Sequence, residues 1–450
     1  MKNPIIPVEQ KIIKTDGEHR LDLKAICCFA AIGFFLDNET YYEDEKVIRA
    51  ASTYENGMEE AYFKWYYEPT ERKLDDVVDE FAALFEGITN RLLKEKRIIL
   101  PLSGGLDSRS QAAALTGRKD VFAYSYEFEG SFNETYYGQK IAEACGWKFR
   151  KYTIPKGYLW DRLSEISKIN GCYSDFVNPR QVAISDYFPQ MGDVFYLGHW
   201  GDVLFDNMNL PADAGADVQI DCLYKKIVKK GGIELAKALW RYWSLEGDFE
   251  EYLRQRLTDL LESIDIQDAN ARVRAFKSLY WAPRWTSVNL SFFSKYHEMA
   301  LPYYDDDMCR FICTVPEKYL ANRLIQIEYI KRKSPELAKI PWQTYHPLNL
   351  YDYHKNHSLI NRSASKVKSL RRMVSEVITN RRMVMRNWEI QYLGEENESH
   401  LRESIYNDRG IAPKEVCDEF LAKFYSGNHK AKIWYSHPVS ILLTLSQKCE

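Results

Sequence analysis

The chain has 450 residues, a formal net charge of −3 and 45% hydrophobic residues. This length is sufficient for two or three domains with a large core, and the near-neutral charge gives no reason to expect a nucleic-acid partner. Because there is no C-x-x-C pair, no secretion signal at MKNPIIPVEQK and no apolar run of about 18 residues, we expect a cytoplasmic protein without a transmembrane segment.

Residues 1–70 are expected to form a short, aromatic-rich lead-in. From Leu74 the apolar residues then recur at steps of three and four, which predicts one amphipathic helix that is closed by Lys94-Glu95-Lys96. The apolar positions of this helix are Val77, Val78, Phe81, Leu84, Phe85, Ile88 and Leu92.

Strands and helices alternate in the next part of the chain, which predicts an α/β fold with a parallel sheet and ligands at the carboxyl ends of the strands. After about residue 210 the pattern becomes helical. The expected strands are 98–102, 121–126, 148–154 and 193–197, and the expected helices are 111–115, 134–144, 224–243, 308–320 and 439–445.

The loop after the first of these strands reads Ser103-Gly104-Gly105-Leu106-Asp107-Ser108 and opens a helix. Two glycines let backbone N–H groups approach phosphate oxygens, and the helix N-terminus adds partial positive charge. The serines add hydroxyl donors, and Asp107 is suited to hold a Mg²⁺ that bridges protein and phosphates. The loop is therefore predicted to hold the pyrophosphate of ATP, the alternative being a plain Gly-Gly turn capped by Asp107. Neither the P-loop spacing nor G-x-G-x-x-G occurs.

A second glycine-bearing loop, Gly198-His199-Trp200-Gly201-Asp202, follows the strand expected at 193–197. The carboxyl ends of parallel strands meet at one edge of a sheet, so this loop is the natural partner of the first.

Ser-Gly-Gly-x-Asp-Ser resembles the PP-loop of ATP pyrophosphatases, and the two loops together resemble the synthetase domain of asparagine synthetases and their relatives. Residues 197–205 match the family's second motif at its glycine, its aspartate and its Leu-Phe tail, and residues 298–305 and, more loosely, 34–40 are similar to other family segments. The resemblance implies a Rossmann-like PP-loop sheet with a largely helical C-terminal half. Residues 1–70 would be a remnant of the glutaminase–synthetase junction, 71–210 the nucleotide-binding core, and 211–450 the part that completes the acceptor site.

The resemblance also implies that Asp107 and Asp202 are the two Mg²⁺ ligands. Three further residues are candidates for catalysis. His199 could act as a base, since an imidazole titrates near pH 6.5, or could only line the pocket. Glu298 could share that role or brace a loop, and Arg109 could neutralise phosphate charge or lie on the surface. Main-chain groups of Leu102 and of residues 124–126 are expected to read adenine. The residues expected to bind ATP are Leu102, Ser103, Gly104, Gly105, Leu106, Asp107, Ser108, Tyr124, Ser125, Gly198 and Gly201.

The implied function is that of an AMP-forming amide ligase that uses ATP and Mg²⁺. A small-molecule or carrier-bound carboxylate would be activated as an acyl-adenylate and transferred to ammonia or an amine. Residue 2 is lysine where the family's glutaminase domain has cysteine, so we expect no glutamine hydrolysis by this chain and nitrogen from free ammonia, an amine or a separate glutaminase. His199 stands where the family has glutamate, which favours an acceptor other than free aspartate.

Two alternative functions are a PP-loop adenylating enzyme that acts on tRNA and a non-catalytic nucleotide-binding partner protein.

Three further features of the sequence can each be interpreted in two ways. The basic segment 362–386 could dock an anion or form a solvated helix face, and Glu134 could reach a ribose or only favour a helix N-terminus. Cys309 and Cys313 could bind a metal or be ordinary buried residues.

Overall fold

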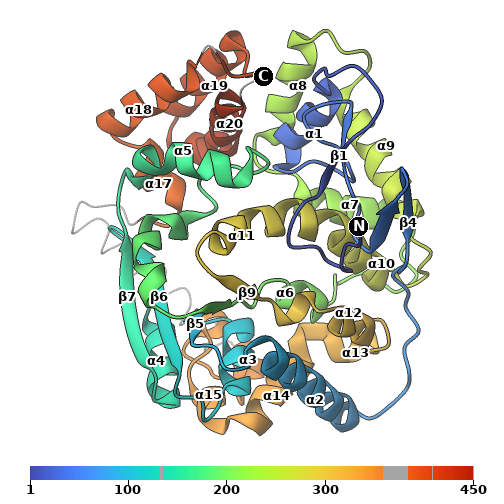
Figure 1. Ribbon diagram of the computed structural model, residues 1–450, viewed down its shortest axis with the longest axis vertical. Helices are drawn as coiled ribbons and strands as arrows, with labels where there is room; N and C mark the ends of the chain where they lie inside the picture. Colours follow the sequence, from blue (N-terminus) through green and yellow to red (C-terminus); the bar gives the residue numbers. More distant parts are fainter. Residues whose placement is uncertain (132–134, 358–383, 408, 449–450) are drawn as a thin grey trace.

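The computed structural model describes residues 1–131, 135–357, 384–407 and 409–448, so Glu134 and residues 362–383 of the basic segment lie outside the described residues. A five-stranded sheet of order β7-β6-β5-β8-β9 organises the nucleotide-binding region (Figure 1). All its pairings are parallel, which confirms the predicted α/β class. The strands are β5 (Ile98–Pro101), β6 (Val121–Phe128), β7 (Lys148–Ile154), β8 (Val194–Tyr196) and β9 (Glu298–Ala300).

Helices cover both sides of this sheet (Figure 1). On one side α2 (Leu74–Leu92) and α3 (Leu106–Ala114) pack with α14 (Leu324–Lys333). Helix α2 has the predicted bounds, and its buried face includes Phe81, whose ring contacts Phe205 and Tyr329. The same side carries α4 (Tyr136–Cys145) and α15 (Pro335–Lys339), and the other side carries α5 (Tyr158–Asn170), η1 (Arg180–Gln190) and α11 (Ser287–Ser294).

Residues 1–70 contribute a helix and four strands to the molecule. Helix α1 (Leu23–Ile32) is buried from Ala25 onward and packs on α8 (Gly232–Tyr242). The contact is close, because a Cβ on Gly232 would overlap the carbonyl of Ala31. The strands form two antiparallel pairs, β1 (Ile12–Lys14) with β2 (Glu45–Val47), and β3 (Ser52–Glu55) with β4 (Met58–Ala61).

The part after residue 200 is largely helical, as predicted, but two expected helices are divided. The stretch 224–243 splits into α7 (Ala216–Ile227) and α8 at Gly231, whose φ is +70°. The stretch 308–320 splits into α12 (Asp306–Ile312) and α13 (Glu317–Leu320), because Pro316 cannot continue a helix. The other elements are α6 (Gly201–Leu204), α9 (Phe249–Glu262), α10 (Ala269–Phe276), η2 (Lys277–Thr286), η3 (Pro302–Tyr304), η4 (Ala321–Arg323), η5 (Gln343–Tyr345), η6 (Tyr353–His357), α17 (Asn387–Tyr392), α18 (Glu395–Ile405), α19 (Lys414–Ser426) and α20 (His429–Gln447).

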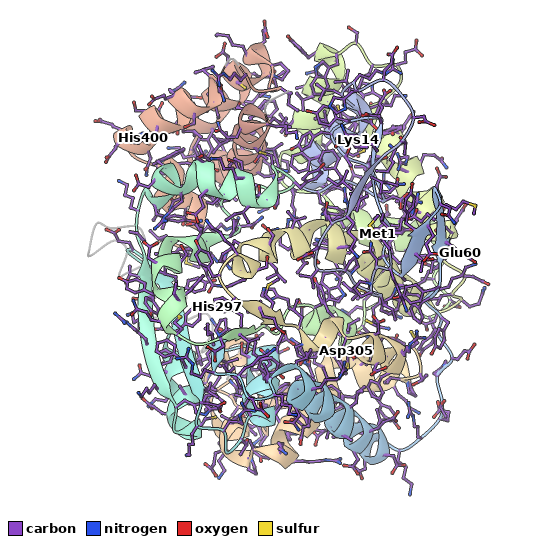
Figure 2. All side chains as sticks on the ribbon, in the orientation of Figure 1. Met1, Lys14, Glu60, His297, Asp305 and His400 are labelled. Atoms are coloured by element: carbon purple, nitrogen blue, oxygen red, sulfur yellow. The ribbon has the colours of Figure 1, made fainter. Side chains whose placement is uncertain are left out.

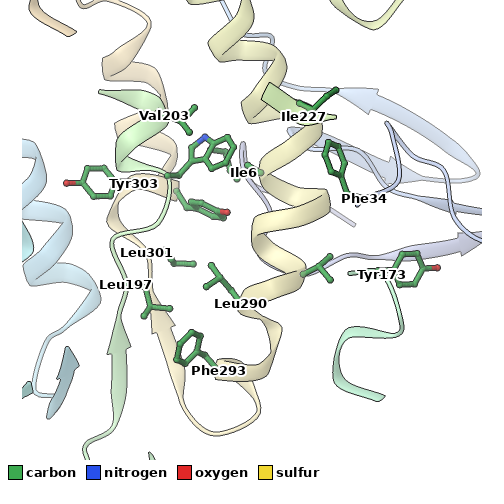
Figure 3. Close-up of a cluster of buried hydrophobic side chains, with 14 of the residues drawn as sticks. Ile6, Phe34, Tyr173, Leu197, Val203, Ile227, Leu290, Phe293, Leu301 and Tyr303 are labelled. Carbon is green, nitrogen blue, oxygen red and sulfur yellow. The ribbon is translucent and has the colours of Figure 1, made fainter. Parts of the chain in front are cut away.

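Side chains fill the spaces between these elements (Figure 2). Buried apolar residues form one cluster that includes Leu197 after β8, Leu290 and Phe293 of α11, and Phe34 near the N-terminus (Figure 3). Leu197 and Trp200 of the loop that follows β8, and Val203 just after it, belong to the same cluster, so this loop is anchored in the core. Within the described ranges, no helix is both long and apolar enough to cross a membrane.

Cys309 and Cys313 are buried, and the Cys313 thiol donates a hydrogen bond to the carbonyl of Cys309 at 3.2 Å. No cluster of three or more His, Cys, Asp or Glu side chains suited to a metal is found among the described residues.

Candidate active site

Two loops meet at the carboxyl edge of the sheet. Strands β5 and β8 are adjacent and parallel, so the loops that follow them leave the sheet at the same edge. Their contact is tight. A Cβ on Gly201 would overlap Asp107 Oδ1 and lie 2.8 Å from the Tyr303 ring, and a Cβ on Gly198 would lie 3.0 Å from Asp107 Cβ. Glycine at these two positions therefore lets the second loop reach the first.

The first loop is held in shape by its own hydroxyl groups. Ser108 Oγ accepts a hydrogen bond from the Ser103 N–H at 3.2 Å and lies 3.0 Å from Ser103 Oγ. The Gly105 N–H donates to Ser103 Oγ at 3.3 Å. A Cβ on Gly104 would lie 2.6 Å from Gln343 Cβ, so the backbone there is tightly enclosed. No described side chain caps the start of α3, which leaves its first-turn N–H groups available to an anion.

The two aspartates expected to hold Mg²⁺ face the same space but have different surroundings. Asp107 Oδ1 accepts a hydrogen bond from Gln326 Nε2 at 3.0 Å and forms an ion pair with Arg323. Burial raises the pKa of Asp107, the Arg323 guanidinium opposes this, and the charge of Asp202 raises it further. Asp202 is exposed, and no described residue forms a hydrogen bond or ion pair with it. One carboxylate is thus fixed and the other is free to bind.

Arg323 and Gln326 were not found from the sequence. Both lie at the start of α14, and Asn322 and Arg323 have left-handed backbone conformations, with φ of 57° and 63°. Such conformations are uncommon for an arginine and concentrate at functional sites. No motif marks these residues, because the ion pair joins positions 216 residues apart along the chain.

A cavity of about 480 Å³ opens between the loops and η2. Of the residues predicted to bind ATP or metal, those that line it are Leu102, Ser103, Asp107, Ser108, Gly198 and Asp202. His199 also lines it, as does Tyr126 from the stretch expected near adenine. The other aromatic and basic residues of the lining, for which the sequence predicted no role, are Arg180, Trp200, Lys277, Trp281 and Trp285. Gly104, Gly105 and Gly201 shape the loops, and Leu106 is buried behind them.

His199 lines this cavity, and its side chain is exposed. Desolvation by the surrounding protein lowers the pKa of His199 below its ordinary value, the Asp202 carboxylate opposes the shift, and Arg180 adds to it. The imidazole is therefore neutral at physiological pH and can accept a proton.

Lys277 begins η2, and its side chain is almost fully buried in the cavity wall. Burial lowers the pKa of Lys277 to about 8, while the nearby Asp202 carboxylate opposes the shift. The ammonium lies 5.2 Å from the centre of the Trp281 ring and 5.8 Å from that of Trp200. The sequence carried no signal for this lysine, because its role depends on where η2 meets the two loops.

Of the residues 124–126 expected near adenine, Tyr124 and Ser125 do not line the cavity. The Tyr124 carbonyl already accepts a hydrogen bond from the Leu102 N–H at 2.8 Å, and Ser125 Oγ donates to the Leu102 carbonyl at 2.7 Å. The Tyr124 side chain is buried and bonded to Gln181. Tyr126, two residues further on and past the last residue paired with β5, lines the cavity instead.

Arg109 does not reach the nucleotide loop, contrary to the expectation. It is fully buried, and its guanidinium donates to the carbonyls of Leu337 at 3.2 Å, Ile340 at 2.8 Å and Pro341 at 3.1 Å. Arg109 follows Asp107 by two residues on α3, and side chains two residues apart on a helix point to nearly opposite sides. The Arg109 side chain therefore points away from the first loop. Arg109 fastens α3 to the segment after α15.

Replacing Arg109 with methionine is expected to lower the free energy of unfolding by about 2–4 kcal/mol, because the three carbonyls lose a buried donor. The KM for ATP should change less than about twofold, since the guanidinium faces away from the loop. Denaturant unfolding and steady-state kinetics measure the two quantities. Arg91→Met, at an exposed arginine, is the control and should leave both unchanged. A large rise in the KM for ATP at unchanged stability would contradict this interpretation and show that Arg109 contributes to nucleotide binding.

Glu298 also lies outside the site. It begins β9, where it pairs with Val194 at the amino edge of the sheet, and its exposed carboxylate forms an ion pair with Lys96 at 2.7 Å. The loops are at the carboxyl edge, so Glu298 cannot share a proton-transfer role with His199. The segment 298–305 reaches the site through Tyr303 instead, whose hydroxyl accepts a hydrogen bond from Gln326 at 2.8 Å.

A parallel sheet that presents a Ser-Gly-Gly-x-Asp-Ser loop and a second acidic loop at one edge defines the PP-loop class of ATP-using synthetases. The asparagine synthase family matches residues 81–326, more than half of the chain, and the chain belongs to this family. Membership places it among ATP-dependent synthetases that form carbon–nitrogen bonds.

Among solved structures, the chain is similar to NMN synthetase from Francisella tularensis (14% identity, 46% of this chain and 93% of that chain, TM-score 0.23). It is also similar to the NH3-dependent NAD synthetase from Campylobacter jejuni subsp. jejuni (13% identity, 42% of this chain and 95% of that chain, TM-score 0.22). No curated protein matches the chain in sequence.

Proposed function

We propose that this protein is an AMP-forming amide ligase. A carboxylate oxygen attacks the α-phosphorus of ATP, the bond to the bridging β-phosphate oxygen breaks, and pyrophosphate leaves. An amine nitrogen then attacks the acyl carbon of the acyl-adenylate, and AMP leaves as the amide forms. The observation that carries this proposal is the meeting of Asp107 and Asp202, from two glycine-bearing loops, at one cavity.

The residues present fit Mg²⁺ and the phosphates of ATP. Two carboxylates are the hard oxygen ligands that Mg²⁺ prefers, and Asp202 has no competing partner among the described residues. When bound there, the ion would supply charge neutralisation for the leaving pyrophosphate. Ser103, Ser108 and the uncapped first turn of α3 provide donors for phosphate oxygens. Adenine recognition then falls to the main chain of Tyr126, which lies beyond the last residue of β6 that pairs with β5.

Proton transfer from the incoming amine is assigned to a ring nitrogen of His199. Its lowered pKa keeps the imidazole neutral, and it lies in the same cavity as the two aspartates. The amine is ammonia or an amino group of a second substrate, supplied free or by a separate glutaminase. The acid is a small-molecule or carrier-bound carboxylate.

A product assay tests the reaction class. The protein is incubated with Mg·ATP, ammonium and a panel of carboxylic acids, and nucleotides and phosphates are separated. We expect AMP and pyrophosphate in equal amounts, dependent on the acid. ADP and phosphate as products would overturn the proposal. Acid-independent release of pyrophosphate with added tRNA would favour the tRNA-adenylating alternative, and nucleotide binding without turnover across the whole panel would favour a binding protein.

A further inference from the structure

One wall of the cavity consists of a lysine and two tryptophans spaced four residues apart on η2, namely Lys277, Trp281 and Trp285. The helix there is wound as a π-helix and contains Pro283, which lacks an N–H and needs room for its ring. Trp200, from the second loop, completes the wall, and its indole N–H donates to Ser278 Oγ at 3.1 Å. We call these four cavity residues the η2 wall.

No carboxylate in the described part of the chain forms a close ion pair with the ammonium of Lys277, and the Asp202 carboxylate of the same cavity acts on it only from a longer distance. The residue is only 8% exposed, and its contacts are the faces of Trp281 and Trp200. A buried charge without a partner is costly, and a ligand that brings an anion to it gains correspondingly. Its opening into the cavity makes a negatively charged group of a bound molecule the natural partner.

Two tryptophans of this wall, Trp281 and Trp285, are partly exposed, whereas Trp200 is buried. A second ammonium, that of Lys229, lies 5.6 Å from the centre of the Trp281 ring and 5.0 Å from that of Trp285. The Trp281 indole nitrogen is buried and has no acceptor among the described residues. Partly exposed indoles beside cations are suited to a ring with an apolar face and an anionic substituent.

On the basis of the proposed function, we propose that the η2 wall binds the acceptor acid and selects an acid that carries a ring and a second anionic group. The ring packs on Trp281 and Trp285, the second anionic group pairs with Lys277, and the carboxylate to be activated points towards the first loop. If Lys277 paired with the carboxylate that reacts, the ion pair would stabilise only the ground state, because adenylation removes that charge. An ion pair between Lys277 and a second, remote anionic group persists throughout the reaction.

Free aspartate fits this wall poorly. It has no ring to cover the indoles, and its ammonium group would face a region that already holds Lys277 and Lys229. The wall therefore favours acids with a flat aromatic or pyranose ring over small amino acids.

Binding of the acid can be measured without turnover. A negative result in this binding experiment is therefore distinguishable from a failure of the proposed AMP-forming reaction. The full chain is loaded with Mg²⁺ and the α,β-methylene analogue of ATP and titrated calorimetrically. The ring dianions are isophthalate and glucuronate 3-sulfate, benzoate has the ring without the second charge, and glutarate has two charges without the ring. We expect at least one ring dianion to bind about tenfold or more tightly than benzoate and glutarate, and the better of the two shows whether the ring is aromatic or a sugar.

Variants separate the two contributions. Lys277→Met should remove the preference over benzoate, and Trp281→Leu the preference over glutarate, while Trp281→Phe retains it. Affinity for the ATP analogue should stay within about twofold throughout. Lys225→Met, at an exposed lysine of α7, is the control and should behave like the unaltered protein. The proposal is overturned if neither ring dianion exceeds glutarate, if Lys277→Met keeps the native preference, or if that variant weakens the ATP analogue instead of the acid.

Discussion

Replacing Asp202 with asparagine is expected to lower the rate of pyrophosphate release by roughly 10³-fold or more, because a neutral amide neither binds Mg²⁺ well nor supports charge neutralisation of the leaving group. The free energy of unfolding should change by less than about 0.5 kcal/mol, since the side chain is exposed and no described residue bonds to it. A coupled pyrophosphate assay and denaturant unfolding measure the two effects. Loss of activity at full stability would identify a functional rather than a structural carboxylate.

The control for this variant is Glu298→Gln. Glu298 is also an exposed carboxylate at the end of a strand of the same sheet, but it lies at the amino edge and is paired with Lys96. Its replacement should leave the rate within about twofold. Full activity of Asp202→Asn, or a large loss in Glu298→Gln, would show that the reacting centre is not at the carboxyl edge.

Replacing Gly201 with alanine should impair both folding and catalysis. The added Cβ would overlap Asp107 Oδ1 and press on the Tyr303 ring, and neither can move freely, because Asp107 is held by Arg323 and Gln326. We expect a loss of about 1–3 kcal/mol from overpacking. A displacement of the carboxylate by about 1 Å should reduce kcat roughly 100-fold in the molecules that remain folded.

Gly215→Ala provides the matched control for this substitution. Gly215 precedes α7 with an ordinary φ of −62°, and a Cβ there meets nothing within 4 Å. Because Gly215 is the N-cap residue of α7, alanine there should cost about 0.5–1 kcal/mol, and it should leave kcat unchanged. If Gly201→Ala were as active as Gly215→Ala, the close contact of the two loops would not be required for catalysis.

Local patterns predicted four of the five strands of the sheet, because the signals of those strands are short in sequence. They missed β9, which has only three residues and therefore no pattern to recognise. Helix α2 has the predicted bounds because its apolar residues repeat with the period of a helix, and β7 has them because its strand is bounded by turn residues. The helical half was predicted less well. Gly231 and Pro316 divide helices that hydrophobic spacing alone would continue.

The candidate site was only partly predictable, because a sequence motif marks residues that are neighbours along the chain but does not show which way each side chain points. Leu102, Ser103, Asp107, Ser108, Gly198, His199 and Asp202 belong to two contiguous loops, and they all line the cavity. Arg109 and Glu298 are close to these motifs in sequence but face elsewhere, one by rotation around α3 and the other by its place at the amino edge of β9.

The sequence by itself determined the class of this protein, because a PP-loop and its partner loop are encoded in two short runs of residues that follow strands. Only the tertiary structure decided which charged groups surround the reacting space. Arg323 reaches Asp107 across 216 residues of chain, and Lys277 enters the cavity from the first turn of η2. Their positions depend on how distant helices pack against the sheet, and packing between distant segments leaves no periodic pattern or motif in the sequence.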